Sequence, residues 1–213
     1  MTAARIVIWR HGQTDWNIIH RFQGQADVPI NEVGQRQALA AAAVLATFEP
    51  AALVSSDLTR TLQTARALAD LTGLDIQQDK RLREIHVGSW EGLTWNKIRE
   101  VDPEPAAALW RGEDVRRSAT GESVAEMADR AAPALAEIGE AAADGSTVVV
   151  TTHGLAGRVA VCQLVGLPAE HWRALGSLDN CSWTIVEWHR GGGYWRIAEY
   201  NVTAPVPASG TVS

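Results

Sequence analysis

The stretch that decides the fold is Arg5-Ile6-Val7-Ile8-Trp9, followed directly by Arg10-His11-Gly12. Its consecutive apolar residues, two of them isoleucines and one a valine, predict a buried strand over Arg5 to Trp9. The chain then changes at once to a cation, an imidazole and a glycine. At the carboxyl end of a strand, this combination suits an anion-binding site that carries its own nucleophile.

Two further strand ends carry residues of the same kind. Arg60 comes soon after the strand-like run Ala52 to Ser55, and His153-Gly154 follows the β-branched run Thr147 to Thr152. Open, largely parallel sheets bind ligands beyond the carboxyl ends of their strands. We therefore predict that the three strand ends converge on one site.

Strand and helix signals alternate along the rest of the chain. Helices are predicted at about residues 32–48 (with Asn31 as N-cap), 58–71, 121–143 (with a kink or break at Pro133), and after the strand at 146–152 as far as about residue 166. Further strands are predicted at 53–55, 75–78, 182–188 and 194–200, the last two as a hairpin around Gly191–Gly193. This alternation predicts an α/β fold, in which helices cover a mostly parallel sheet.

The segment from residue 85 to about residue 120 interrupts the alternation. It contains Trp90, Trp95 and Trp110, two prolines and a charged turn. We interpret it as a small inserted cap over the site, with a long surface connection as the alternative. Its tryptophans are expected to form the core of the cap rather than a platform for a ligand. Residues 1–203 are expected to form one domain, and residues 204–213, which are small and polar, a disordered tail.

Composition narrows the possible functions. The chain has 213 residues and a net charge of -6, which argues against a general nucleic-acid binder but allows a small anionic ligand. No apolar segment is long enough for a membrane span or a signal peptide, so we expect no membrane partner. Cys162 and Cys181 lack C-x-x-C spacing, and Cys162 lies in an apolar run. Free buried thiols and a cytoplasmic location are therefore predicted.

Arg60 occupies a locally unfavourable position. A cation in the first turn of a helix faces the positive end of the helix dipole, whereas a bound anion would reverse the sign of that interaction. Arg10 and Arg60 would hold phosphoryl oxygens and lower the pKa of a nearby imidazole, which would leave it neutral and able to attack phosphorus. A surface arginine that points into solvent is the alternative.

A metal site is the rival use of His11 and His153. Two adjacent guanidinium groups would repel a divalent cation, and the chain has no H-x-x-x-H or H-E-x-x-H spacing. We therefore predict no metal. Cysteine-phosphatase, P-loop and serine-hydrolase motifs are missing from the sequence as well.

Five motifs over about residues 5 to 165 resemble the phosphoglycerate-mutase-like branch of the histidine phosphatase superfamily. They are Arg10 to Asn17 (RHGQTDWN), Arg21 to Gly24 (RFQG), Ser55 to Ala65 (SSDLTRTLQTA), Leu82 to Glu84 (LRE) and Thr152 to Gly154 (THG). The resemblance implies a three-layer α/β/α sandwich and a phosphohistidine intermediate, with no metal or cofactor.

The same resemblance implies a role for each site residue. His11 would be the nucleophile. Glu84 would protonate the leaving oxygen and then act as the base for the hydrolytic water. The implied phosphate pocket consists of Arg10, Asn17, Gln23, Arg60 and His153. Of these residues, His153 is also expected to be catalytic.

The other candidate residues are mostly assigned structural or surface roles. Glu91 is a second carboxylate near the predicted acid and is expected to be structural. His86 is assigned substrate contact or packing, as equal alternatives. Surface or structural roles are expected for His20, His171 and His189.

The resemblance favours a metal-independent phosphatase that hydrolyses a small phosphomonoester, such as a phosphosugar or a phosphoglycerate derivative. The sequence after Glu84 and the short insertion differ from those of cofactor-dependent mutases, which remain an alternative. A non-catalytic binding module on the same fold is a second alternative. Leu82 to Trp90 and Leu175 to Thr184 resemble actinobacterial phosphatases that act on glucosyl-3-phosphoglycerate. The hairpin around Gly191 offers an edge for a homodimer.

Overall fold

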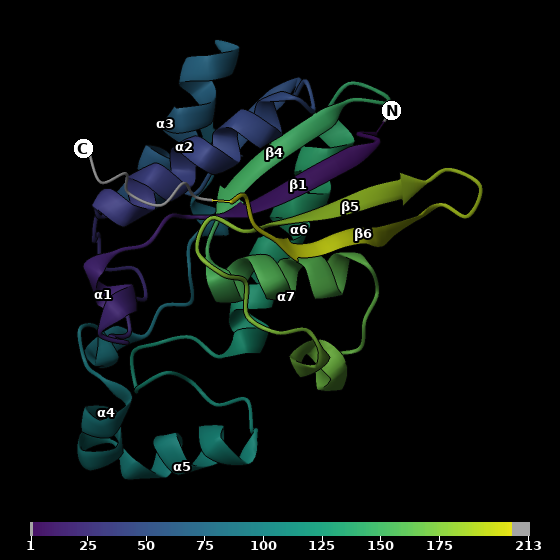
Figure 1. Ribbon diagram of the computed structural model, residues 1–213. Helices are drawn as coiled ribbons and strands as arrows, with labels where there is room; N and C mark the ends of the chain where they lie inside the picture. Colours follow the sequence, from purple (N-terminus) through teal and green to yellow (C-terminus); the bar gives the residue numbers. More distant parts are fainter. Residues whose placement is uncertain (1, 206–213) are drawn as a thin grey trace, which may run out of the picture.

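A six-stranded sheet in the order β3-β2-β4-β1-β5-β6 forms the middle of the molecule (Figure 1). The structure is a computed structural model and describes residues 2–205. The strands are β1 (Arg5–Arg10), β2 (Ala52–Ser55), β3 (Ile76–Gln78), β4 (Thr147–Thr152), β5 (Trp183–His189) and β6 (Tyr194–Val202). β1 to β4 are mutually parallel, whereas β5 runs antiparallel to β1 and to β6.

Helices cover both faces of the sheet, and β1 shows why. Side chains alternate between the two faces of a strand. Ile6 and Ile8 pack into a cluster with residues of α6 (Val124–Ala141) and α7 (Gly154–Leu164). Val7 and Trp9 pack into a second cluster with α2 (Glu32–Ala46) and α3 (Thr59–Thr72). The predicted α/β class and the three-layer arrangement are confirmed.

The helix ends follow the capping signals in the sequence. The side chain of Asn31 accepts a hydrogen bond from the N–H of Gly34 at 2.9 Å, as predicted for the start of α2. α3 ends at Gly73, whose φ of +74° is easily adopted by glycine. α6 begins at a capping box between Ser123 and Glu126, later than predicted.

Of the kink or break predicted at Pro133, the break is wrong, since α6 continues through this residue. Proline removes one intrahelical hydrogen bond. Its neighbours Ala131, Ala132, Ala134 and Leu135 are all buried. Burial of this apolar stripe against the sheet offsets the lost bond.

Several short elements connect this sandwich. They are α1 (Asp15–Ile18), α4 (Trp95–Val101), α5 (Pro103–Arg111) and the 3₁₀ turns η1 (Lys80–Leu82), η2 (Gly88–Trp90) and η3 (Ala169–Ala174). The cap segment, residues 85–120, contains η2, α4 and α5. Its two α-helices lie well below the sheet in Figure 1. Ile85, Trp90 and Ile98 pack with α6 and α7 residues in a third apolar cluster.

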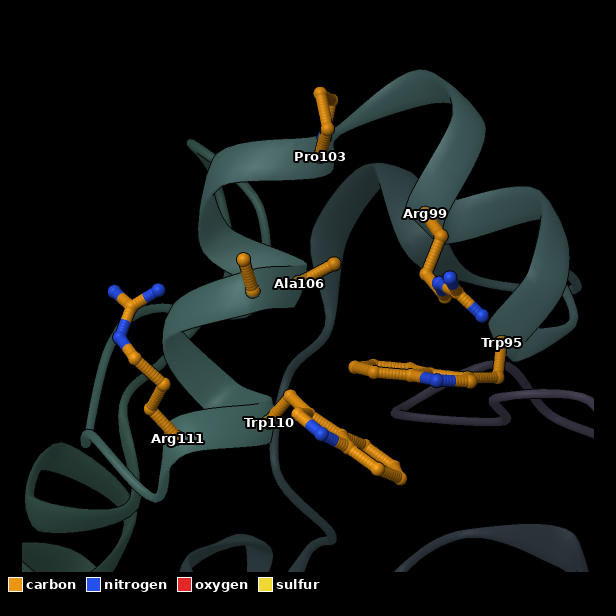
Figure 2. A pocket seen from close by; sticks show the side chains of 7 residues that line it. Trp95, Arg99, Pro103, Ala106, Trp110 and Arg111 are labelled. Carbon is orange, nitrogen blue, oxygen red and sulfur yellow. The ribbon is translucent and has the colours of Figure 1, made fainter.

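The tryptophans of the cap segment have three different environments. Trp90 is buried, with 1% of its surface exposed, and Trp95 stacks on Phe22 at a centroid distance of 6.2 Å. Trp110 is 82% exposed, so its predicted place in a cap core is wrong. α5 turns Trp110 outward, and Figure 2 shows its indole beside that of Trp95 at an open cavity of about 570 Å³.

The remaining predictions concern the cysteines, the membrane and the tail. Cys162 and Cys181 are free and buried, as predicted. None of the helices within residues 2–205 combines the length and apolar character needed to cross a membrane. Ala204 still packs on the α2–α3 side of the core. The predicted disordered tail lies outside the described residues from position 206 onward.

Candidate active site

The sheet order brings the three predicted strand ends together. β1 lies beside β4 with Arg10 opposite Thr152, and the N–H of His11 donates to the carbonyl of Thr152 at 3.0 Å. β2 lies on the other side of β4, where the N–H of Ser56 donates to the carbonyl of Thr151 at 2.9 Å. The residues after β1, β2 and β4 therefore form one edge.

His11 is held in the form that a nucleophile requires. Its ring is buried, with 3% of its surface exposed, and Nδ1 lies 2.7 Å from the carbonyl oxygen of Gly12. A carbonyl oxygen only accepts, so Nδ1 carries the proton and Nε2 keeps its lone pair. Burial, followed by the charges of Arg60 and Arg10, lowers the pKa of His11 well below its ordinary value. The ring is therefore neutral near pH 7.

His153 is the second imidazole of the site. It is fully buried as the residue before α7, and its ring centroid lies 5.3 Å from that of His11. Nε2 lies 3.0 Å from the hydroxyl oxygen of Ser56, and Nδ1 has no hydrogen-bond partner within residues 2–205. Burial is the largest cause that lowers the pKa of His153, and Arg60 is the next. A neutral ring with one free nitrogen can contact a bound oxygen.

Arg60 is buried and does not point into solvent, so the surface alternative is wrong. Its two Nη atoms donate to the carbonyls of Ala26 at 2.7 Å and Gly24 at 2.8 Å. Its Nε is buried and has no partner in the described part of the chain. Burial lowers the pKa of Arg60 to about 10, against the opposing charge of Glu84. Arg60 therefore brings the loop after Gln23 to the site.

Arg10 approaches the start of α7 very closely. Its Nη1 donates to the carbonyl of Leu178, and its Nε has no partner among the described residues. A Cβ atom at Gly154 would lie 3.3 Å from the guanidinium carbon of Arg10, so any side chain there would press on this guanidinium. Burial lowers the pKa of Arg10, and Glu84 is the largest opposing charge.

Glu84 lies at the positive end of α7. Its Oε1 accepts from the N–H groups of Ala156 at 3.0 Å and Ile85 at 2.9 Å, and its Oε2 accepts from Leu155 at 3.1 Å. These backbone N–H groups fix the position of both carboxyl oxygens. The same helix that follows His153 thus holds the predicted acid beside the phosphate pocket.

Asn17 lies in α1, and Gln23 lies on the loop that follows this helix. The Oδ1 of Asn17 accepts from the N–H of Thr14 at 2.9 Å and from Nδ2 of Asn180 at 3.2 Å. That same Nδ2 donates to the carbonyl of His11 at 3.1 Å. The Oε1 of Gln23 is buried and has no partner within residues 2–205.

The structure adds two residues that the sequence prediction missed. Ser56 contacts His153, and Asn180 links His11 with Asn17. Ser56 directly follows a predicted strand, which was an available signal. Asn180 lies in the run from Leu175 to Thr184 and carried no signal of its own.

The remaining candidates stand apart from the two imidazoles. Glu91 accepts from the N–H of Gln25 at 3.1 Å, a contact that braces the Gly24 loop. The Nδ1 of His86 lies 3.0 Å from the carbonyl of Thr120, within the cap segment. His20 and His171 are exposed, and His189 stacks on a tyrosine of the β5–β6 hairpin. Within residues 2–205, no group of three or more His, Cys, Asp or Glu side chains could bind a metal.

A neutral imidazole that feels the positive charges of two nearby guanidinium groups is suited to attack an anionic electrophile. The fold and the site therefore define a phosphoryl-transfer enzyme with a histidine nucleophile. This chain belongs to the histidine phosphatase superfamily, branch 1, whose profile matches residues 6–203. It is a phosphatase of the class that acts through a phosphohistidine.

Two relatives and one solved structure are informative. The chain is 39% identical to the glucosyl-3-phosphoglycerate phosphatase of Mycobacterium tuberculosis, over 97% of this chain and 98% of that protein. A solved mycobacterial glucosyl-3-phosphoglycerate phosphatase with bound VO3 superposes with a TM-score of 0.86 at 39% identity, covering 94% of this chain and 100% of that one. A probable phosphoglycerate mutase of Yersinia pestis is 36% identical over 86% of this chain and 85% of its own length.

Proposed function

We propose that the substrate is glucosyl-3-phosphoglycerate or a close analogue, hydrolysed with His11 as nucleophile and Glu84 as proton donor. The observation that carries the chemistry is the buried His11 ring, whose Nδ1 meets the carbonyl of Gly12 and leaves Nε2 for attack, near the charges of Arg10 and Arg60. The observation that supports the substrate is 39% identity to a phosphatase of that name, over nearly the full length of both chains.

In the first step, the Nε2 lone pair of His11 attacks phosphorus. A P–N bond forms while the bond from phosphorus to the leaving oxygen breaks, and a protonated Glu84 gives its proton to that oxygen. Arg10 and Arg60 stabilise the charge on the non-bridging oxygens. The neutral ring of His153 and the amides of Asn17 and Gln23 add neutral contacts.

In the second step, water hydrolyses phosphohistidine. The Glu84 carboxylate removes a proton from the water, whose oxygen bonds to phosphorus as the P–N bond breaks. Inorganic phosphate leaves, while Glu84 is protonated again and His11 is neutral. The proton balance of the two steps closes without a metal or a cofactor.

A mutase is the second candidate, because one relative is named a probable phosphoglycerate mutase. A mutase returns the phosphoryl group from histidine to a second hydroxyl, whereas a phosphatase gives it to water. The two activities share the first step, so only the products distinguish them.

The experiment measures phosphate release and isomer formation on a panel of phosphomonoesters. The panel contains glucosyl-3-phosphoglycerate, 3-phosphoglycerate, glucose 6-phosphate and α-ribazole 5′-phosphate. We expect glucosyl-3-phosphoglycerate to give the highest kcat/KM, with free phosphate as the product. A higher kcat/KM for another ester would overturn the proposed substrate. Formation of an isomer without release of phosphate would establish mutase activity.

A trapping experiment tests the intermediate. Acid-labile, alkali-stable label from a ³²P-ester should appear in the wild-type protein and not in His11→Ala. The exposed His171→Ala is the matched control and should label normally. Equal labelling of His11→Ala would exclude His11 as the nucleophile.

We also propose the cytoplasm as the compartment and a homodimer as the assembly. The two free, buried cysteines support the first. The outer edge of β6, which pairs with β5 in the described sheet, offers a surface for the second. Light scattering of the purified protein tests the dimer, and a monomer mass would exclude it.

A further inference from the structure

We propose that Arg130, together with Glu122, is a positioning residue that sets the place of Glu84 in the reaction. This inference rests on the proposed role of Glu84 as proton donor. Arg130 lies on α6, outside the cluster of His11, Arg10 and Arg60. It acts on Glu84 through the backbone of the segment that carries it.

The guanidinium of Arg130 binds three carbonyls in and beside that segment. Its Nη1 donates to the carbonyls of Arg81 at 2.8 Å and Arg83 at 2.7 Å. Its Nη2 donates to the carbonyl of Glu84 itself at 2.9 Å. The backbone from the end of η1 to Glu84 therefore surrounds the guanidinium of Arg130.

Glu122 holds Arg130 and the other side of Glu84. Its carboxylate accepts from Nε of Arg130 at 2.9 Å and from Nη2 at 2.7 Å. It also accepts from the N–H of His86 at 2.8 Å, while its own N–H donates to the carbonyl of His86 at 2.7 Å. The chain is thus fixed both before and after Glu84.

All five N–H donors of the Arg130 guanidinium are matched by these five bonds. Both side chains of the ion pair are about one-fifth exposed, so the pair is partly shielded from water. A lysine would bring three donors from a single point and could not reproduce this fork. The contact is therefore specific for arginine.

The position of Glu84 matters because proton transfer requires hydrogen-bond distance to the leaving oxygen. A displacement of about 1 Å can reduce a rate by about a hundredfold. The side chain of Glu84 is anchored separately, by the N–H groups of Leu155 and Ala156 on α7. Arg130 fixes the backbone relative to α6, and the two anchors together define the reach of the carboxylate.

The experiment compares esters with poor and good leaving groups. 3-Phosphoglycerate releases an alkoxide that needs a proton, whereas 2,4-dinitrophenyl phosphate releases an anion that does not. The value of kcat/KM reports transfer to His11 alone. We expect Arg130→Lys and Glu122→Gln to lower kcat/KM for 3-phosphoglycerate about tenfold to a hundredfold, and for the dinitrophenyl ester less than about threefold.

Two variants calibrate this comparison. Glu84→Gln should show the same leaving-group pattern in a stronger form. Arg81→Lys is the matched control, because its side chain pairs with Asp79 and Glu137 and its carbonyl alone meets Arg130. Arg81→Lys should change kcat/KM for both esters by less than about twofold. Circular dichroism and thermal melting establish whether each variant is folded. If Arg130→Lys does not fold, Glu122→Gln alone is used for the comparison.

Three outcomes would overturn a proposal, and they are distinguishable. Equal losses on both esters in Arg130→Lys would mean that Arg130 only supports the fold. Unchanged kinetics in both Arg130→Lys and Glu122→Gln would remove any role in catalysis. If Glu84→Gln itself shows no leaving-group pattern, the proposed acid is wrong, and the inference about Arg130 falls with it.

Discussion

The hydroxyl oxygen of Ser56 lies 3.0 Å from Nε2 of His153, whereas Nδ1 of the same ring has no hydrogen-bond partner within residues 2–205. Ser56 is itself fixed, because its N–H donates to the carbonyl of Thr151 on β4. The orientation of the second imidazole is therefore determined by a strand end that it does not belong to.

Replacing this hydroxyl should weaken catalysis without unfolding the protein. Ser56→Ala leaves Nε2 of His153 without a partner and frees the ring to rotate. We expect kcat/KM to fall about tenfold, which corresponds to about 1.4 kcal/mol. Ser55→Ala is the control, because Ser55 also donates a buried hydrogen bond but contacts the carbonyl of Ser56 instead. Equal effects of the two variants would contradict this account.

The histidine pKa values can be measured directly by NMR. Burial and the charges of Arg60 and Arg10 lower the pKa of His11, so its ring should remain neutral as the pH falls through about 6.5. Removing one positive charge in Arg10→Gln should raise that pKa. Arg99→Gln removes an exposed charge on α4 and should leave it unchanged. A His11 that titrates near 6.5 in the wild-type protein would show that burial and the two arginine charges do not lower its pKa.

Stability should depend on pH through the same two rings. The pKa values of His11 and His153 are lowered in the folded state, so below about pH 6.5 the unfolded chain binds more protons. The free energy of unfolding should therefore decrease as the pH falls from 7 to 5. Urea titrations would show a flatter dependence for His11→Gln/His153→Gln than for the wild type. His171→Gln, at an exposed position, should keep the wild-type slope.

Gly12 should tolerate no side chain. A Cβ atom there would lie 2.5 Å from the carbonyl oxygen of Gly34, in the first turn of α2. Gly12→Ala must push the catalytic loop away from that helix, at a cost of about 1–3 kcal/mol in unfolding free energy and with a large loss of activity. Gly176→Ala is the control, since a Cβ atom there meets nothing within 4 Å. An active, stable Gly12→Ala protein would refute the close approach.

Replacing the buried Trp90 and the exposed Trp110 should have different effects on the free energy of unfolding. Trp90→Ala empties a buried site in the cap segment and should cost about 3–5 kcal/mol. Trp110→Ala removes an exposed indole and should change the unfolding free energy by less than about 0.5 kcal/mol. Chemical denaturation measures both. A comparable cost for the two variants would mean that Trp110 is covered in solution.

Local patterns predicted most of the sheet and the shared edge of Arg10, His11, Arg60 and His153, whereas Asn17, Gln23 and Glu84 were implied only by the family motifs. The apolar run before His11 and the β-branched run before His153 identify strands, and parallel strands share one carboxyl edge. The role of Arg130 was missed because three of its five bonds go to backbone carbonyls, which any sequence provides. The exposure of Trp110 was missed because a nine-residue helix gives too short a pattern to orient one residue.

The central place of β1 in the sheet has a consequence for synthesis of the chain. β1 lies between β4 and β5 (Figure 1), and both of these strands are translated more than 130 residues later. At about 5–20 residues per second, a ribosome leaves this apolar strand without neighbours for on the order of ten seconds. The nascent chain therefore carries an unpaired apolar strand until β4 and β5 have been made, and chaperones can bind the strand during that time. Because the site residues follow β1, β2 and β4, phosphatase activity is a measure of the correct pairing of these strands.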